Sequence, residues 1–385
     1  MIEILYGLLF LVLAIPILIF GIYGIIILYY GKLKRSEENV EQSTENKSEP
    51  LVSVVIATHN EEKIISKKIE NILSSNYPID KIEIVLVDDS NDSTPQIIDE
   101  CSKKYSNIQL IRFNERMGYS PSMVAGVKAA KGQIIVLNDA GSFLDVQAIR
   151  NSVARLEDPE VGVVTGKDMI LNINESVGKS ESIYLRILDF LRTAETNLDS
   201  TFIIKGEATA VRKDLIKDLE ICGETFDTTV GLFVRQQGYK VVYDPTVKFY
   251  EYAPSTNSDL IKQKTNRGAN WIKVLWRYRH VMFKRKYGKY GSIILPMDFG
   301  MIAVAPVMIM IAFTLLVVLT FFNPSFFAFI WAGLGFIFLL FLVFSRNLIL
   351  TFVRFEYSLI KAFYQVIFTK RNHDRLDKVD STRRC

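Results

Sequence analysis

The sequence predicts an α/β domain with a mostly parallel sheet, flanked by apolar segments that are long enough to cross a membrane. Between residues 51 and 166, short β-branched runs alternate with helical patterns, which is typical of a parallel sheet connected by helices. Charge is almost absent on either side, because residues 1–30 hold one charged residue and residues 299–345 hold none. A polar domain is therefore expected between hydrophobic segments.

The predicted strands are continuous apolar runs, which suit a sheet buried on both faces. They cover residues 51–57, 82–87, 108–113, 134–138 and 161–166, and helical patterns lie between them at 61–75, 94–105, 120–130 and 145–157. Ligands of open parallel sheets bind beyond the carboxyl ends of the strands. Three predicted strands end in acidic segments, THNEE (58–62), DDSNDST (88–94) and NDAGS (138–142), so carboxylates are expected at one edge.

The first apolar segment, residues 4–30, exceeds the roughly 20 residues that a membrane-spanning helix needs. A signal peptide would have a shorter apolar core, a basic stretch before it and a small-residue cleavage site after it, and the sequence shows none of these. Residues 1–31 are therefore expected to be a retained transmembrane anchor. The basic GKLKR that follows favours a cytoplasmic location for this end, and residues 32–50 form a polar linker.

The second apolar block, residues 293–345, is too long for one span. FFNPS (321–325) interrupts it with Asn-Pro, a turn signal. The sequence therefore predicts a transmembrane hairpin, with helices at about 293–321 and 326–345.

The segments beside this hairpin are mixed in character. Residues 266–292 are rich in aromatic and basic side chains, which predicts an amphipathic helix at the membrane surface. Residues 346–385 are expected to form a second interfacial helix and a basic cytoplasmic tail. The whole pattern predicts a multi-pass protein of the plasma membrane whose domain at 51–265 is cytoplasmic.

Several functional classes fit the sequence poorly. No G-x-G-x-x-G and no phosphate loop follows a predicted strand, and a Ser-His-Asp hydrolase is disfavoured by only three histidines and no G-x-S-x-G. The net charge of +4 gives no support for a nucleic-acid partner, and the three cysteines match no metal or redox spacing, so free thiols are expected. Without a glycine-rich loop, a bound diphosphate would need other positive charge, for which a metal held by carboxylates is suited.

These segments resemble the family 2 inverting glycosyltransferases, which have the GT-A fold. The resemblance rests on VSVVIATHNEE, IEIVLVDDSNDST, ERMGYSPSMVAGVKAAKGQIIVLNDAGS, GEATAVRKDL, FDTTVGLFVRQQGYKVVYDP and QKTNRGANW, which occur in the family's order over roughly residues 51–280. The flanking apolar helices are similar to the membrane-embedded branch of the family, which includes cellulose and hyaluronan synthases and polyprenol-linked enzymes.

The resemblance implies a hexosyltransferase that moves a sugar, with inversion, from a UDP- or GDP-sugar to a lipid-linked or other membrane-proximal glycan acceptor. Such an enzyme takes part in polysaccharide or glycolipid biosynthesis. A carboxylate deprotonates the acceptor hydroxyl, and a divalent cation, Mg²⁺ or Mn²⁺, neutralises the leaving diphosphate.

By this resemblance, nucleotide binding falls to residues at the ends of the first two strands. Asp88 and Asp89 match the family's first acidic pair, and Asp88 is preferred as the hydrogen-bond partner of the nucleobase. The backbone near Thr58 and the Glu61 side chain would complete that pocket. Asp92 is instead expected to cap the following helix.

The resemblance assigns the donor phosphates to two further segments. Arg116 falls in the family's Arg-x-Gly-Lys, where Tyr119 replaces the lysine, and Arg116 either faces the phosphates or is a solvated loop residue. Asp139 matches the first acid of the family's D-x-D motif, but Gly141 stands in the place of the second. Asp139 is expected to bind the ribose or to hold the metal with waters and phosphate oxygens.

Asp227 matches the acid that precedes the family's general-base helix and is predicted to be the base. Glu224 is the alternative base, and a helix-capping role for Asp227 is the structural alternative. A non-catalytic sugar-nucleotide sensor or synthase subunit is the competing function, and a soluble nucleotidyltransferase is disfavoured by the predicted spans.

The segment QKTNRGANW stands where processive relatives have Gln-x-x-Arg-Trp. Gln263 is retained, whereas Asn266 and Arg267 occupy the arginine and tryptophan places. Gln263, Lys264, Arg267 and the earlier Gly206 are therefore predicted at the acceptor or diphosphate site. Loss of the tryptophan weakens a case for processive synthesis.

Overall fold

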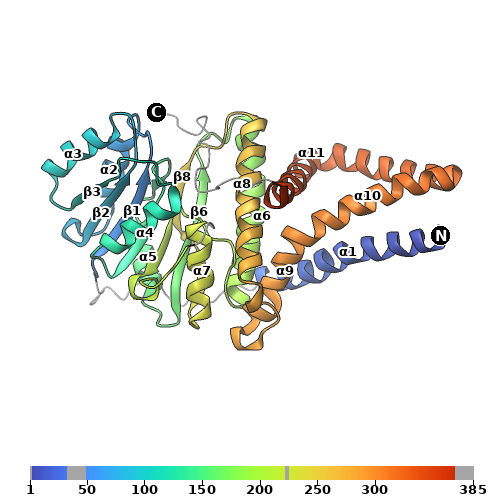
Figure 1. The fold of residues 1–385 in the computed structure, drawn as a ribbon, viewed down its shortest axis with the longest axis horizontal. Coiled ribbons are helices and arrows are strands. Elements are labelled where there is room, and N and C mark those ends of the chain that lie inside the picture. The colour runs from blue at the N-terminus through green and yellow to red at the C-terminus, as the bar shows by residue number, and fades with distance from the viewer. Residues whose placement is uncertain (1, 33–48, 222–224, 369–385) are drawn as a thin grey trace.

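The structure, a computed structural model, describes residues 2–32, 49–221 and 225–368, with only the backbone described at 336–349. It has three parts that follow one another across the molecule (Figure 1). A sheet covered by helices lies at one end, two long helices (α6, Ser176–Leu198, and α8, Asn257–Arg277) stand beside it, and the apolar helices project from their far side. Most of the predicted polar linker, the Glu224 alternative base and the basic tail fall outside the described residues.

The sheet has eight strands in the order β3-β2-β1-β4-β7-β6-β8-β5. Its first four strands are parallel, as predicted, and confirm the apolar runs as strands. They are β1 (Val52–Thr58), β2 (Ile82–Asp88), β3 (Ile108–Arg112) and β4 (Ile134–Leu137). The fifth predicted run is also a strand, β6 (Val161–Ile170).

The far half of the sheet is mixed in direction and contains three strands that the apolar runs did not predict. They are β5 (Phe143–Leu144), β7 (Thr209–Arg212) and β8 (Lys240–Glu251). Strand β7 is antiparallel to both β4 and β6, whereas β8 is parallel to β6. The fold is thus an α/β fold with a mostly parallel sheet, as the sequence predicts.

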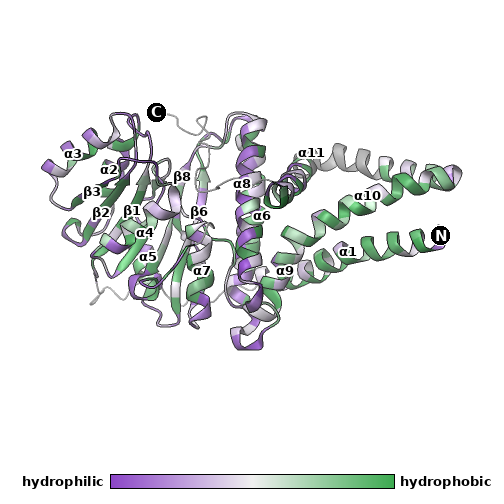
Figure 2. Cartoon of the chain, viewed as in Figure 1, coloured by the Kyte–Doolittle hydropathy of each residue, from purple (hydrophilic) through white to green (hydrophobic). Residues whose placement is uncertain are grey.

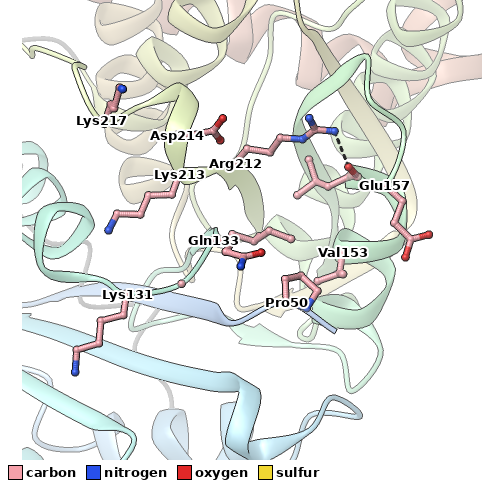
Figure 3. Close-up of a pocket in the computed structure, with 12 residues that line it drawn as sticks. Pro50, Lys131, Gln133, Val153, Glu157, Arg212, Lys213, Asp214 and Lys217 are labelled. Atoms are coloured by element: carbon pink, nitrogen blue, oxygen red, sulfur yellow. Dashed lines mark hydrogen bonds between the residues drawn. The ribbon is translucent and has the colours of Figure 1, made fainter. Parts of the chain in front are cut away.

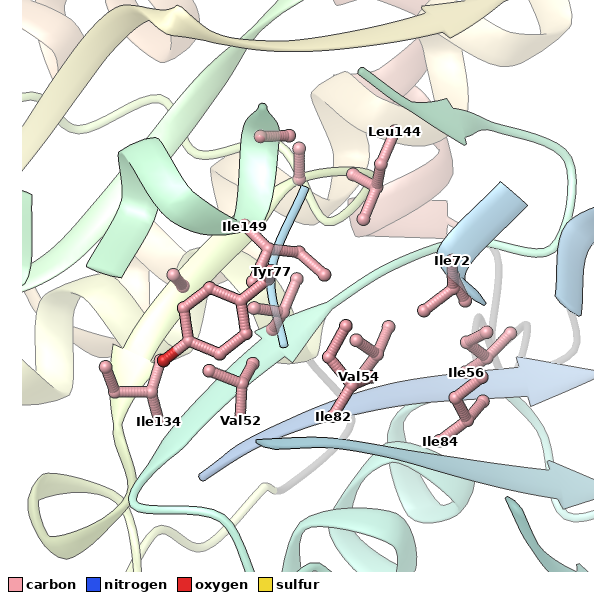
Figure 4. Packing of buried hydrophobic residues seen from close by; sticks show 14 of the residues in the cluster. Val52, Val54, Ile56, Ile72, Tyr77, Ile82, Ile84, Ile134, Leu144 and Ile149 are labelled. Carbon is pink, nitrogen blue, oxygen red and sulfur yellow. The ribbon is translucent and has the colours of Figure 1, made fainter. Parts of the chain in front are cut away.

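Helices cover both faces of the sheet, which is why its parallel strands are mostly apolar. Along β1, Val54 and Ile56 face one core cluster, and the intervening Val55 faces the other (Figure 4 shows part of the first). The first cluster is closed by α2 (Ile65–Leu73), α3 (Thr94–Lys104) and α5 (Ala148–Leu156), and the second by α4 (Tyr119–Ala129) and α7 (Phe226–Gln236). Four of them, α2, α3, α4 and α5, confirm the helical patterns predicted between the strands.

Helices α6 and α8 join the sheet domain to the apolar helices. Helix α6 was not predicted, and α8 begins at Asn257, so it crosses the predicted domain boundary at 265/266. A third core cluster connects them to the last helix, because Ala269 and Val274 of α8 are buried together with Leu359 and Ala362. The two-helix layer is therefore continuous with both neighbours.

Among the described residues, two stretches of helix are long and apolar enough to cross a membrane. They are α1 (Ile2–Lys32) and the run Tyr290–Phe322, which contains α9 (Leu295–Phe299) and α10 (Ala305–Phe322) (Figure 2). The predicted turn at Asn-Pro is present, since α10 ends at Phe322 and α11 (Pro324–Phe368) begins two residues later. Helix α11 continues without a break, so one helix replaces the predicted second half of the hairpin and the separate helix after it.

The close approach of α4 to the sheet generates a stability prediction. A Cβ added at Gly126 would lie 2.4 Å from Val55 Cγ1 and 3.0 Å from Val87 Cγ2, both on stiff β-branched side chains. We expect Gly126→Ala to lower the free energy of unfolding by about 1–3 kcal/mol, the usual cost of overpacking. Denaturant unfolding of the detergent-solubilised protein measures it.

Gly24→Ala, in α1, is the matched control, because a Cβ there meets no atom within 4 Å. Equal stability of the two variants would contradict the close packing of α4.

Candidate active site

The predicted acids lie at the carboxyl edge of the parallel strands. Strands β1 and β2 end in register, with Thr58 opposite Asp88, and β4 ends beside β1 with Leu137 opposite Val55. Asp139, two residues beyond β4, is therefore brought toward the same edge. This is the edge at which open α/β sheets bind ligands.

Asp88 is fully buried and its carboxylate is held on one side by hydroxyl groups. Thr58 Oγ1 donates to Asp88 Oδ1 at 2.7 Å and Ser90 Oγ donates to the same oxygen at 2.6 Å. The Ser90 N–H donates to Asp88 Oδ2 at 3.2 Å. The carboxylate is thus rigidly oriented, as a residue that reads a nucleobase must be.

Asp89 has a different place, because its carboxylate binds the loop before α4. Its Oδ2 accepts from the backbone N–H groups of Met117 at 2.9 Å and Gly118 at 3.2 Å, while Oδ1 lies 2.8 Å from His59 Nδ1. Gly118 has φ 90°, which only glycine adopts easily. Asp89 therefore shapes the loop that carries Arg116, whose side chain is exposed.

Helix α3 begins close to this edge and explains Asp92. The Asp92 carboxylate accepts from Thr94 N–H at 3.0 Å and Thr94 Oγ1 at 2.6 Å, which confirms the expected capping role. The Glu61 N–H donates to Thr94 Oγ1 at 2.8 Å, and the Glu61 side chain is buried. The segment after β1 is thereby fixed against the start of α3.

At the centre of the site, Tyr119 and Asp227 face Gly206, and Asp139 lies beside Tyr119. A Cβ at Gly206 would lie 2.8 Å from Tyr119 Oη and 3.2 Å from Asp227 Oδ2, so both groups face the bare glycine backbone. Burial raises the pKa of Tyr119 well above its ordinary value, and the charges of Asp139 and Asp227 add to the effect. Tyr119 thus lies between the two acids that the sequence singles out.

Asp227 lies in the first turn of α7. Its Oδ1 accepts from Thr225 Oγ1 at 2.6 Å and from the Thr228 N–H at 2.8 Å. Burial raises the pKa of Asp227, although these hydrogen bonds oppose the shift. An aspartate whose pKa lies above its ordinary value binds a proton more readily, which suits a general base. Thr225, not Asp227, is the N-cap residue of the helix.

Helix α8 brings a cation to this centre. Arg267 Nη2 donates to Glu207 Oε1 at 2.8 Å, and Gln263 lies one turn earlier on the same helix. Lys264 is directed elsewhere, with its Nζ 2.5 Å from Glu181 Oε1. Burial lowers the pKa of Lys264 to about 8, against the pull of Glu181. Of the residues predicted on α8, Arg267 is the one joined to the centre.

Lys68 is a buried cation beside Asp139 that sequence reasoning missed. It is fully buried on α2, its Nζ donates to the Ser142 carbonyl, and it lies 5.8 Å from the Phe143 ring centroid. Burial lowers its pKa to about 7, and the charge of Asp139 opposes that shift. The Lys68 amine thus holds the loop after β4 in place through the Ser142 carbonyl.

The carboxylates of this site permit a simple metal site. Within the described residues, no group of three or more His, Cys, Asp or Glu side chains could together hold a metal ion, and Gly141 supplies no side chain. Mg²⁺ keeps several waters and is commonly bound by one or two carboxylates together with substrate phosphates. Asp139 alone therefore fits a metal that arrives with a diphosphate.

Glu207 and the role of Tyr119 were also missed from the sequence. Glu207 lies in the segment that leads into β7. Tyr119 occupies a place that a lysine fills in the family. The replacement of the family's lysine by Tyr119 is visible in the sequence and could have pointed to this residue. The Glu207–Arg267 pair spans 60 residues of sequence and has no local pattern.

A separate surface hollow lies at the opposite edge of the sheet, where β1 and β4 begin (Figure 3). Two of its cations are bound to neighbouring carbonyls: Arg212 Nη2 donates to Leu156 O and Asp158 O, both at 2.8 Å, and Lys213 Nζ donates to Ala130 O. None of the acids of the carboxyl edge lines it.

Comparison with known proteins agrees with this geometry. Residues 53–219 match the family model described as glycosyl transferase family 2. Over 264 residues the chain is 28% identical to "Probable glycosyltransferase YdaM" of Bacillus subtilis, covering 65% of this chain and 63% of that protein. Over 265 residues it is 24% identical to a poly-beta-1,6-N-acetyl-D-glucosamine synthase of Staphylococcus aureus, covering 67% of this chain and 64% of the synthase. The chain thus spans less than two thirds of the length of either relative.

The fold is shared with a mannosyltransferase, PcManGT of Pyrobaculum calidifontis, solved in complex with GDP-Man and Mn²⁺. That structure superposes with a TM-score of 0.72 at 22% identity and covers 94% of this chain and 100% of its own. The match therefore shows the same GT-A-like fold. The match to the glycosyl transferase family 2 model covers residues 53–219, which include Asp88, Asp139 and Gly206.

Proposed function

We propose that the protein is a membrane-bound glycosyltransferase that transfers a sugar, with inversion, from a nucleoside-diphosphate sugar to an acceptor hydroxyl. One observation carries the proposal: Asp227 and Tyr119 face Gly206, and Asp139 lies beside Tyr119, at the carboxyl edge of a sheet whose residues 53–219 match the glycosyl transferase family 2 model. Asp227 is the general base. Its Oδ2 faces the open backbone of Gly206, while Oδ1 is held by Thr225 and Thr228.

The mechanism uses the remaining groups to bind the donor. Asp88 reads the nucleobase, supported by Thr58 and the buried Glu61, and Asp89 positions the loop that carries Arg116 toward the phosphates. Arg267 lies beside the centre and supplies positive charge for the leaving diphosphate. Inversion follows when the acceptor oxygen, deprotonated by Asp227, attacks opposite the diphosphate.

Asp139 would hold the metal, Mg²⁺ or Mn²⁺. When bound, the cation supplies charge neutralisation for the diphosphate. Lys68 fixes the loop that follows Asp139 through the Ser142 carbonyl, so the carboxylate is presented from a rigid backbone.

The acceptor is proposed to be lipid-linked or otherwise close to the membrane. Helix α8, which carries Arg267 and Lys264, stands with α6 between the sheet domain and the apolar helices (Figure 1). Two of those apolar stretches are long enough to cross a membrane. An acceptor held in the bilayer would thus approach from the side on which α8 lies, with the domain in the cytoplasm of a multi-pass protein. The GDP-Man bound in the PcManGT structure supports a nucleotide-sugar donor, a GDP- or UDP-sugar by the family resemblance, and the glycan named for the Staphylococcus aureus synthase supports a glycan product.

A non-catalytic sugar-nucleotide-binding subunit or sensor is the second candidate. Gly141 in the second metal-ligand place and Asn266 in the arginine place favour it. The two functions differ in a donor panel scored by release of nucleoside diphosphate with Mg²⁺ or Mn²⁺ added. Release from any donor supports the enzyme, and binding without release from every donor supports the sensor.

The first prediction concerns the base. Asp227→Asn removes the proton acceptor but keeps the size of the side chain, so we expect turnover to fall by about 10²–10⁴-fold, the usual contribution of general-base catalysis. Nucleoside diphosphate release by the purified protein in detergent measures it, and circular dichroism checks the fold.

Asp92→Asn is the matched control, because Asp92 is an acid of the same edge that caps α3. Turnover in that variant should stay within about twofold of the wild type, since an Asn also caps helices. Full activity of Asp227→Asn would overturn the assignment of the base.

The second prediction concerns pH. The base must be ionised, and burial raises the Asp227 pKa, so kcat/KM should fall on the acid side with an apparent pKa above the usual aspartate value of about 4. Thr225→Val removes a hydrogen bond that stabilises the ionised form, so this acid limb should move to higher pH. An acid limb at the ordinary aspartate value, unmoved in Thr225→Val, would argue against Asp227 as the titrating group.

The third prediction concerns the metal. Chelation with EDTA should lower turnover at least about tenfold, with recovery on addition of Mg²⁺ or Mn²⁺, because the diphosphate needs added positive charge. Asp139→Asn should weaken the Mn²⁺-dependent binding of the nucleoside diphosphate, measured by calorimetry with and without Mn²⁺. Unchanged Mn²⁺-dependent affinity in Asp139→Asn would remove Asp139 from the metal site.

A further inference from the structure

Glu207 is a buried carboxylate at the reaction centre to which the proposed mechanism gives no role. We propose that Glu207 is a positioning residue: it holds the Arg267 guanidinium at the centre and places a negative charge beside the base Asp227. This inference deepens the proposed function and rests on it. The contacts, the burial and the charges around Gly206 support this role of Glu207.

The contacts of Glu207 join three elements. Its Oε1 accepts from Arg267 Nη2 of α8 at 2.8 Å, and its backbone carbonyl accepts from Asn138 Nδ2 at the end of β4. Its neighbour Gly206 lies beside both Tyr119 Oη and Asp227 Oδ2. Glu207 therefore links the strand that leads to Asp139, the helix that carries Arg267 and the glycine that the base faces.

Burial makes this pairing specific. The Glu207 side chain is 9% exposed and that of Arg267 is 24% exposed, so the pair is largely shielded from water. Such a pair requires good geometry, and loss of one partner leaves the other charge poorly compensated. Burial by itself lowers the pKa of Arg267, but the surrounding carboxylates, led by Glu207 and Glu251, raise it above its usual range. Arg267 consequently stays charged at any working pH.

Asp227 feels charges from every element around it. Burial is the main cause of its raised pKa, Glu207 adds to the shift, and Arg267 opposes it. The titratable and charged groups at this centre come from α4, the loop after β4, the segment before β7, the end of β8 and α8: Tyr119, Asp139, Glu207, Glu251 and Arg267. Burial and the charge of Glu207 also raise the pKa of Glu251, to about 8.

This arrangement gives the two acids different tasks. Glu207 is engaged by a guanidinium, whereas Asp227 Oδ2 faces the glycine. A negative neighbour makes Asp227 a stronger base, and the same neighbour prevents Arg267 from pairing with Asp227 and weakening it. Glu207 thus separates the cation that binds phosphate from the carboxylate that accepts the proton.

Glu207→Gln tests the proposal, because it removes the charge and keeps both the volume and an oxygen that can accept from Arg267. The acid limb of kcat/KM should move to lower pH by on the order of half a unit or more, and the KM for the donor should change because the Arg267 guanidinium loses the negative charge that it pairs with. Glu160→Gln is the control, since Glu160 forms a carboxylate–lysine pair 2.6 Å long on the exposed surface. An acid limb that stays in place in folded Glu207→Gln would overturn the proposal.

A second measurement does not depend on turnover. At pH 8 the ionised Asp227 is unfavourable in the folded state, because its folded pKa is raised, so Asp227→Asn should raise the melting temperature. The increase should be smaller in the Glu207→Gln background, where less repulsion remains to be relieved. Equal increases in both backgrounds would overturn the inference. Absence of turnover in the wild type would instead overturn the proposed function, and the melting cycle would still decide the role of Glu207.

Discussion

Burial of the parallel strands on both faces is the constraint on which the site depends. Helices cover the two faces, so the backbone groups at the strand ends are the polar positions that remain open to a ligand. Thr58 and Asp88 end in register, and Asp139 follows the adjacent β4. The antiparallel β7 then returns alongside β4 and delivers Gly206 and Glu207 to the same place. Asp88, Asp139 and Glu207 are brought to one edge because the strands beside them are paired in a fixed register.

The buried apolar runs allowed the parallel strands and their connecting helices to be predicted, since their pattern is local. Strand β8 has several exposed positions after its buried start, unlike the continuous apolar runs of the predicted strands, and neither it nor α6 was recognised as an element. Asp227, Asp139 and Arg267 could be located from family motifs. Lys68 and Glu207 could not, because each acquires its partner through space, across 74 and 60 residues respectively.

A second set of buried charged side chains, next to Gly206 in sequence through Lys205, is also paired. Asp168 is fully buried and receives Lys205 Nζ, with Arg192 Nη2 at 3.6 Å. Burial would raise the pKa of Asp168, but the two cations lower it overall. Lys205 immediately precedes Gly206, so this buried network fixes the backbone that the base faces. A rigid supporting shell of this kind is what a catalytic carboxylate needs to keep its orientation.

The attachment of α1 to α6 has a mechanical consequence. Tyr23 Oη donates to the buried Glu195 at 2.7 Å, and Asn197 Nδ2 donates to the Tyr30 carbonyl at 2.9 Å. Two such bonds, one turn of α6 or less apart, prevent α6 from swivelling about the first apolar helix. With α1 in a bilayer, the reaction centre would work at a fixed height above the lipid headgroups. Any change in the distance of the proposed acceptor from the membrane would then have to come from movement of the acceptor, not of the protein.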